Sequence, residues 1–386
     1  MVNNISKKDI EVVRSFLLTN PILTQSKKVE LFEKKWSKWL GVKYSVFVNS
    51  GSSANFISMK VLKILKKTPK EVIVPTLTWN SDIVSVIESG FKPVFVDIDL
   101  KNLSMSENEI LKKINKNTQA IFLTHAQGFN GLSKNLIKIL NNKKIDLIED
   151  CCESHGAKFN KKKIGTFGIM SNFSFYYAHH MSTIEVGMIS TNSKKIYEIC
   201  RMIRGHGLLR ESKDQNLKNK IEKKYKDLSK EFIFVYPGFN MRSNEISAVI
   251  GLNQLKRLSK NNLKRTKNLN YFLKNLNKEL FFTEYDLKGS SNYAFPIILN
   301  KKYFNLRYKL EETMKKNLIE FRKGNAGGGN QLRQPYLKKF LSKINLKDFK
   351  NVEHVHFYGY YIGNYPNLSF LKIKRITNIL NKINEN

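Results

Sequence analysis

Between about residues 40 and 200, short apolar runs alternate with longer stretches in which apolar residues recur at helical spacing. The helical stretches include residues 53–66 and 82–88. Alternation of strands with helices predicts βαβ units, and therefore an α/β fold with a mostly parallel sheet whose faces are covered. The runs rich in β-branched and aromatic residues, which predict strands, are 44–50, 71–76, 92–98, 120–125, 145–150, 171–177 and 187–191.

The remainder of the chain has a different pattern. Residues 205–235 are polar and rich in lysine, which predicts a long loop or an exposed helix. Apolar residues at helical spacing over 244–276 predict one long helix, continuous or broken. A strand at 293–299 and helices at 309–316 and 371–381 follow, with a glycine run at 327–329. We therefore expect a large α/β domain over 1–250, with an N-terminal helix, and a smaller C-terminal α+β domain over 251–386.

The net charge is the unusual feature of the composition. The chain has 67 Lys+Arg and 32 Asp+Glu, which gives +35 over 386 residues. Such a charge suggests a nucleic-acid-binding protein, but the basic residues are scattered in short runs from end to end. We favour a general surface property with no nucleic-acid partner. No apolar run has membrane-spanning length and the N-terminus lacks a signal-peptide pattern, so we expect a cytoplasmic protein with no membrane partner.

Three cysteines, Cys151, Cys152 and Cys200, exclude a disulfide-rich scaffold. They have no CxxC spacing, and we expect no metal site.

The segment VFVNSGSSANF predicts a strand that turns at Gly51 into a helix beginning with small residues. Free backbone N–H groups and the positive end of the helix dipole meet there, which suits a phosphate group. The alternative is an ordinary helix start with Ser52 as the N-cap.

Two further polar or aromatic residues follow strand-like runs. Asp150 ends an apolar run, at the sheet edge where α/β folds bind ligands, and a buried Asp there needs a cationic partner. Trp79 follows another run and could stack on a planar ring. Helix capping by Asp150 and core packing by Trp79 are the alternatives.

Two adjacent histidines, His179 and His180, follow the run at 171–177. Neighbouring residues on a turn do not converge on one point, so we favour one histidine in acid/base chemistry over a metal pair. A histidine that acts as a base must be neutral before it accepts a proton, which fits a pKa of its imidazole near the working pH.

The order of GSSAN, Trp79, EDCCESHGA, GTFG, FSFYYAHHMSTIEVG and PGFNMRSNEISAVIGLNQL resembles the sugar aminotransferases among fold type I enzymes that use pyridoxal 5'-phosphate (PLP). The resemblance implies PLP-dependent transferase fold type I with a seven-stranded, mostly parallel sheet. It also implies a homodimer with shared active sites. The cofactor-binding roles that it implies fall to Gly51, Ser52 and Ser174 at the phosphate, Asp150 at the pyridine nitrogen, Trp79 on the ring, Glu153 near the cofactor hydroxyl, and Asn240 of the second subunit at the phosphate.

One position departs from these aminotransferases. Their PLP-binding lysine stands six residues before a Glu, and here Glu185 is preceded at that distance by His179. There is no lysine between Lys163 and Lys194. The register from Ser174 and Glu185 favours His179 over His180 as the catalytic base. Val186 also replaces a usual glycine, a change that we cannot interpret.

Histidine in place of lysine resembles the 3-dehydratases of this family, which act on 4-keto-6-deoxy nucleotide sugars. The resemblance implies an enzyme in which L-glutamate converts PLP to its amine form, PMP, and the C3 hydroxyl and ammonia are lost. Deoxysugar synthesis for a surface polysaccharide is then expected. One branch of these enzymes carries an iron–sulfur cluster, which needs four cysteines, so three exclude it.

Substrate-binding candidates are His206 and Arg210, with Arg204 nearby, because Arg suits phosphate. They could equally be surface groups of a mobile segment. Asn325, Arg333 and His356 resemble substrate-loop positions of the dehydratases, although the glycine run beside Asn325 is also explained as a flexible turn. The remaining alternatives are a true sugar aminotransferase, a basic nucleic-acid-binding protein and a non-catalytic relative.

Overall fold

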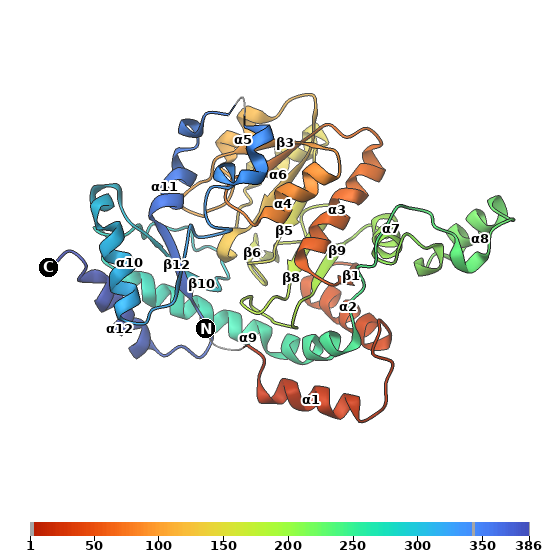
Figure 1. Cartoon of the computed structure of the whole chain (residues 1–386), viewed down its shortest axis with the longest axis horizontal. Helices are drawn as coiled ribbons and strands as arrows, with labels where there is room; N and C mark the ends of the chain where they lie inside the picture. Colours follow the sequence, from red (N-terminus) through yellow and green to blue (C-terminus); the bar gives the residue numbers. More distant parts are fainter. Residues whose placement is uncertain (1–3, 342–343, 386) are drawn as a thin grey trace.

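The computed structural model describes residues 4–341 and 344–385. Its centre is a seven-stranded sheet in the order β1-β9-β8-β5-β4-β2-β3 (Figure 1). Strand β9 is antiparallel to both neighbours, and the other pairs are parallel. The mostly parallel sheet predicted from the sequence is confirmed. Its strands are β1 (Tyr44–Val48), β2 (Glu71–Pro75), β3 (Lys92–Val96), β4 (Thr118–Thr124), β5 (Asp146–Asp150), β8 (Met170–Ser174) and β9 (Gly187–Thr191).

Helices cover both faces of this sheet, and successive strand residues alternate between the two cores. Val46 and Val48 belong to the core beneath α3, α4 and α7, whereas Phe47 belongs to the core beneath α2, α5 and α6. Successive side chains of a strand point to opposite faces, so a strand buried on both faces requires apolar residues at consecutive positions. The covering helices are α2 (Lys27–Leu40), α3 (Gly51–Lys66), α4 (Asn80–Glu88), α5 (Glu107–Lys113), α6 (Lys134–Lys143) and α7 (Lys194–Arg204).

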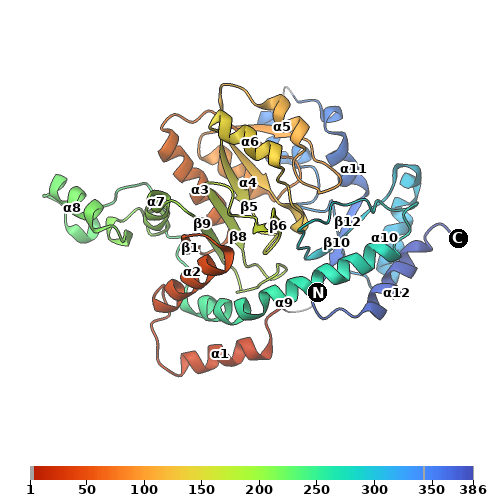
Figure 2. The ribbon, with the colours of Figure 1, turned by 180° about the vertical axis from the view of Figure 1, so that it is seen from behind.

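The C-terminal part contains a smaller antiparallel sheet in the order β10-β12-β11. The long helix predicted over 244–276 is α9, Glu245–Asn275, and it runs unbroken from the large sheet to the small one (Figures 1 and 2). The expected domain boundary at 250 lies inside this helix and stays a prediction. The elements of this part are β10 (Ala294–Ile298), α10 (Arg307–Lys316), β11 (Phe321–Lys323), α11 (Lys350–Tyr358), β12 (Gly359–Gly363) and α12 (Phe370–Asn381).

The lysine-rich segment after α7 contains α8, Gln215–Lys224, which has no buried residue and projects away from the sheet (Figures 1 and 2). The expected exposed segment is therefore partly helical. Helix α1, Lys7–Leu17, packs along α9, where Asp9 pairs with Arg257. A short hairpin of β6 (Lys158–Phe159) and β7 (Lys162–Lys163) completes the strands, and no helix among the described residues is long and apolar enough to cross a membrane.

Helix α9 also holds the start of α2. Ser26 precedes α2 without making a side-chain cap. Instead, the buried carboxylate of Glu245 accepts N–H bonds from Ser26 and Val29 at 2.9 Å and from Lys28 at 2.8 Å. A carboxylate at a helix N-terminus satisfies unpaired donors and interacts favourably with the helix dipole. This contact joins two segments that are more than 200 residues apart.

We predict that Glu245→Gln lowers the free energy of unfolding by about 2 kcal/mol, because hydrogen bonds to a charged acceptor are weakened. Urea denaturation monitored by circular dichroism would measure the change. Glu11→Gln, at an exposed position of α1, is the control and should change stability by less than about 0.5 kcal/mol. Equal denaturation midpoints for Glu245→Gln and the control would contradict the capping role.

Candidate active site

The predicted cofactor residues gather at the carboxyl edge of the large sheet, where open α/β folds bind ligands. Trp79 follows β2, Asp150 ends β5, and Ser174 ends β8 with His179 five residues later. The loop after β4 carries Gln127, and α3 begins directly after β1. Strand β8 stops at Ser174, three residues earlier than the apolar run predicted, because the chain turns through a bond from the His179 N–H to the Tyr176 carbonyl.

The N-cap of α3 differs from the residue that the sequence suggested. Ser50, rather than Ser52, is the N-cap, and its hydroxyl accepts the Ser53 N–H at 3.0 Å. Gly51 is the first helical residue and not a turn residue. A Cβ there would lie 2.7 Å from the Ser174 Cβ, so glycine lets β8 approach the helix end. Ser52 and Ser174 thus lie beside the first turn of α3, whose leading N–H groups have no partner within the helix.

Asp150 is 4% exposed and is held only by neutral donors. Its carboxylate accepts the Cys152 N–H at 2.8 Å and the side-chain amide of Asn55 at 2.9 Å. Within the described residues no cation pairs with it. A buried carboxylate without a cation is costly, so this position fits a ligand that brings a positive charge, such as a protonated pyridine nitrogen.

Trp79 is the residue immediately before α4, and its side chain is 62% exposed. The core-packing alternative is therefore wrong. An exposed indole at the ligand-binding edge of the sheet is available to stack on a planar ring.

The two histidines have different surroundings. His179 lies at the surface of a cavity of about 910 Å³, and its Nδ1 is 3.2 Å from the Ser174 carbonyl oxygen. His180 is 1% exposed, and its Nε2 is 2.8 Å from the Ser291 carbonyl oxygen. Burial lowers the pKa of His179 to about 4, although the Ser174 carbonyl and the Asp150 charge act in the opposite direction. This pKa is below the working pH, not near it as we expected, and the imidazole is neutral there.

Glu153 is fixed by two groups that the sequence did not single out. Its carboxylate accepts the Gln127 N–H at 2.7 Å and the Tyr293 hydroxyl at 3.0 Å, and burial raises its pKa to about 7. Asn325 is fully buried and contacts the same glutamine. Its backbone carbonyl oxygen accepts a hydrogen bond from the Gln127 side-chain amide at 2.6 Å. Asn325 therefore reaches the site through Gln127. The backbone of Gln127 has a positive φ of 51°, which the sequence does not indicate.

Three other candidates, His206, Arg210 and Asn240, are not among the residues that line the cavity beside His179. His206, Arg210 and Asn240 all belong to the segment that carries α8, where Arg210 lies over the Phe232 ring at 5.4 Å. The exposed Asn240 contacts Arg242. Arg204 does not belong with them, because it is 1% exposed and pairs with Glu33 at 2.7 Å.

His356 and Arg333 lie around α11, behind the glycine-rich loop. The Nδ1 atom of His356 accepts the Asn330 N–H at 3.3 Å, and Arg333 pairs with Glu353. A Cβ at Gly329 would lie 2.6 Å from the His356 ring, so this glycine allows close packing with a positive φ of 97°. The flexible-turn alternative does not explain that contact.

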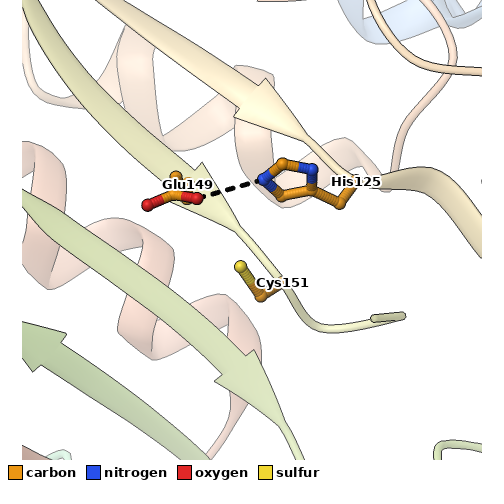
Figure 3. Close-up of side chains that lie close together, drawn as sticks. All are labelled: His125, Glu149 and Cys151. Carbon is orange, nitrogen blue, oxygen red and sulfur yellow. Dashed lines mark hydrogen bonds and ion pairs between the residues drawn. The ribbon is translucent and has the colours of Figure 1, made fainter. Parts of the chain in front are cut away.

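A second cluster, His125, Glu149 and Cys151, has the composition of a metal site, and its potential ligand atoms lie within 4.8 Å of one another (Figure 3). The Glu149 carboxylate already accepts N–H groups of Gly165, Phe167 and Gly168 at 2.7–2.9 Å and lies 3.3 Å from His125 Nε2. His125 Nδ1 accepts the Gly131 N–H at 3.1 Å. These contacts occupy the acceptor atoms, and we interpret the cluster as a structural network.

The fold and this site define a PLP enzyme of fold type I, because the helix N-terminus, the unpaired buried carboxylate and the exposed indole fit the phosphate, the ring nitrogen and the ring. The model of the DegT/DnrJ/EryC1/StrS aminotransferase family matches residues 3–381. The chain belongs to this family, and the resemblance inferred from the sequence is confirmed.

Among curated relatives, GDP-4-keto-6-deoxy-D-mannose 3-dehydratase of Escherichia coli O55:H7 is 32% identical over 370 residues, 94% of each chain. A crystal structure of GDP-4-keto-6-deoxymannose-3-dehydratase with a trapped PLP-glutamate geminal diamine has a TM-score of 0.88 and 30% identity, and covers 98% of both chains. A mutant of that enzyme with bound GDP-perosamine has a TM-score of 0.84 and 31% identity, again over 98% of both.

We predict that Zn²⁺ does not raise the thermal unfolding midpoint of the apoprotein, because protein donors already occupy the acceptor atoms of Glu149 and His125. Differential scanning fluorimetry with and without 0.1 mM Zn²⁺ tests this, since a ligand bound to the folded state raises the midpoint. A rise that disappears in Cys151→Ser would show that the cluster binds metal.

Proposed function

We propose that this protein is a PLP/PMP-dependent 3-dehydratase that removes the C3 hydroxyl of a 4-keto-6-deoxy nucleotide sugar. L-Glutamate is the amino donor, ammonia is released, and no iron–sulfur cluster is involved. The observation that carries the proposal is His179 at the site, with no lysine between residues 163 and 194. An imidazole cannot form the covalent bond that a lysine amine makes with PLP, but it can move protons.

The hydrogen bond of His179 assigns a role to each ring nitrogen. Because the partner of Nδ1 is a carbonyl oxygen, Nδ1 carries the proton and donates a hydrogen bond to the Ser174 backbone carbonyl. The lone pair is then on Nε2. A neutral imidazole with a free Nε2 is a general base ready to accept a proton, and the protonated ring can then assist departure of the C3 hydroxyl. The lowered pKa keeps this base unprotonated at neutral pH.

Each of the proposed cofactor residues would contact a different part of PLP. Ser52, Ser174 and the first turn of α3 would hold the phosphate, with Gly51 allowing the close approach, and Asp150 would pair with the ring nitrogen. Trp79 would stack on the ring and Glu153 would lie by its hydroxyl. When bound and converted by glutamate to its amine form, the cofactor would supply a conjugated system whose electrons pass to the substrate and expel the C3 hydroxyl.

The cavity beside His179 supports an anionic substrate. Arg322 and several other basic side chains line it. Positive charge in a cavity attracts a diphosphate group. These other basic residues include Lys260, Lys264, Lys372 and Arg375.

We further propose a homodimer, in which His206, Arg210 and Asn240 reach the partner's active site. The projection of α8 away from its own sheet supports this, because the segment is extended and largely unburied (Figure 1). Asn325 and His356 would contribute from the same chain. A nucleotide-sugar substrate for surface-polysaccharide synthesis is consistent with a cytoplasmic enzyme.

We predict that the protein, with PLP and L-glutamate, converts one of a panel of GDP-, CDP- and dTDP-linked 4-keto-6-deoxy sugars to a 3-deoxy ketone. Mass spectrometry should show loss of the hydroxyl, and an enzyme-coupled assay should detect ammonia in equal amount. The alternative function, a sugar aminotransferase, gives an amino sugar and no ammonia. That product would overturn the dehydratase assignment.

We predict that His179→Lys binds PLP covalently and loses at least 100-fold in dehydration rate, because the base is replaced by an amine that captures the cofactor. Borohydride reduction followed by mass spectrometry measures the covalent bond. His180→Asn is the matched comparison at the neighbouring position and should keep measurable dehydration. Full dehydration by His179→Lys would exclude His179 as the base.

A further inference from the structure

A second carboxylate is buried behind Asp150. Asp82 lies in the first turn of α4, where it is 0% exposed. The side-chain amide nitrogen of Asn55 is 2.6 Å from Asp82 Oδ1 and 2.9 Å from Asp150 Oδ2. One amide group from α3 therefore links the two carboxyl groups, which also hydrogen-bond each other directly.

Apart from Asp150, the other contacts of Asp82 are neutral as well. Its Oδ2 contacts the hydroxyls of Thr78 and Thr124, which are 3.0 Å from each other. The Cys152 thiol and the Tyr336 hydroxyl also face it, and burial raises the pKa of both groups. Among the described residues, no lysine, arginine or histidine pairs with Asp82.

Two ionised carboxylates in this place would leave an uncompensated buried charge even after a protonated pyridine nitrogen had bound. One cation balances one anion. Burial, and then the charge of Asp150, raise the pKa of Asp82 well above its usual range. The hydroxyls of Thr78 and Thr124 donate to Asp82, so the hydrogen bond that a protonated Asp82 donates goes to the Asp150 carboxylate.

We propose that Asp82 is a neutral positioning residue, which holds Asn55 so that Asp150 alone presents its negative charge to the cofactor nitrogen. This inference rests on the PLP site proposed above. Asp82 itself does not touch the cofactor. Its effect passes through its own hydrogen bond to Asp150 and through the amide of Asn55, which fixes one oxygen of Asp150 while Cys152 fixes the other.

The test compares Asp82→Asn with Asp82→Ala. Asparagine is neutral, has the same shape and keeps an oxygen acceptor for Asn55, so PLP should bind the apoprotein within about threefold of the native dissociation constant. Alanine removes the link and should weaken PLP binding by about 10- to 100-fold, the range found when groups that orient a ligand are removed. Fluorescence quenching by PLP measures both constants.

A second readout separates positioning from a merely structural role. The pH at which the absorption of bound PLP changes should move downwards in Asp82→Ala and stay in place in Asp82→Asn, because only the former releases Asp150 from its orientation. Asn55→Ala removes the same link from α3 and should shift both readouts as Asp82→Ala does. It replaces Asp82→Ala if that variant does not fold.

Two results would overturn the inference. Asp82→Asn could lose PLP as strongly as Asp150→Asn, which would show that Asp82 acts as an anion. Alternatively, Asp82→Ala, or Asn55→Ala in its place, could bind PLP with native affinity and pH dependence. That result would show that the hydrogen-bonded link between Asp82 and Asp150 has no role. Both readouts precede any sugar chemistry, so failure of the dehydratase assay leaves this test intact.

Discussion

The site depends on a buried negative charge for which the described chain supplies no positive one. Asp150 is satisfied by an amide and a backbone N–H, and these donors orient it but cannot neutralise it. The same strand ends bring a helix N-terminus close by, which attracts an anion. A ligand with a cationic ring nitrogen and an anionic phosphate satisfies both requirements at once, and this explains why a chain with no lysine at the site can still hold PLP.

Two adjacent carboxylates of β5 have different roles because successive side chains of a strand point to opposite faces of the sheet. Glu149 and Asp150 point to opposite faces of the sheet. Glu149 accepts three backbone N–H groups of residues 165–168 and fixes the loop that leads into β8. Asp150 faces the ligand side. A carboxylate saturated by backbone donors is structural, whereas one held by few neutral donors remains available to a ligand. The local hydrogen bonds, and not the residue type, distinguish them.

The fold could be predicted largely from the sequence, because strands buried on both faces are continuous apolar runs. The positions of Asp150, Trp79 and His179 were predictable as residues at the end of such runs or just beyond them. Asn55, Asp82 and Gln127 were missed because their roles come from partners 26 to 198 residues away. An Asp in the first turn of α4 is ordinary at a helix start, and only its burial and the amide that it shares with Asp150 reveal more.

Replacement of lysine by histidine changes what the loop after β8 must provide. A lysine forms a covalent bond and is positioned by it, whereas an imidazole must be oriented by the protein alone. The Ser174 carbonyl supplies that orientation and fixes the tautomer. Ser174 also stands beside the α3 N-terminus, so the residue that borders the expected phosphate site sets the proton position on the base. In the proposed mechanism, cofactor binding and proton transfer are therefore coupled through one residue at the end of one strand.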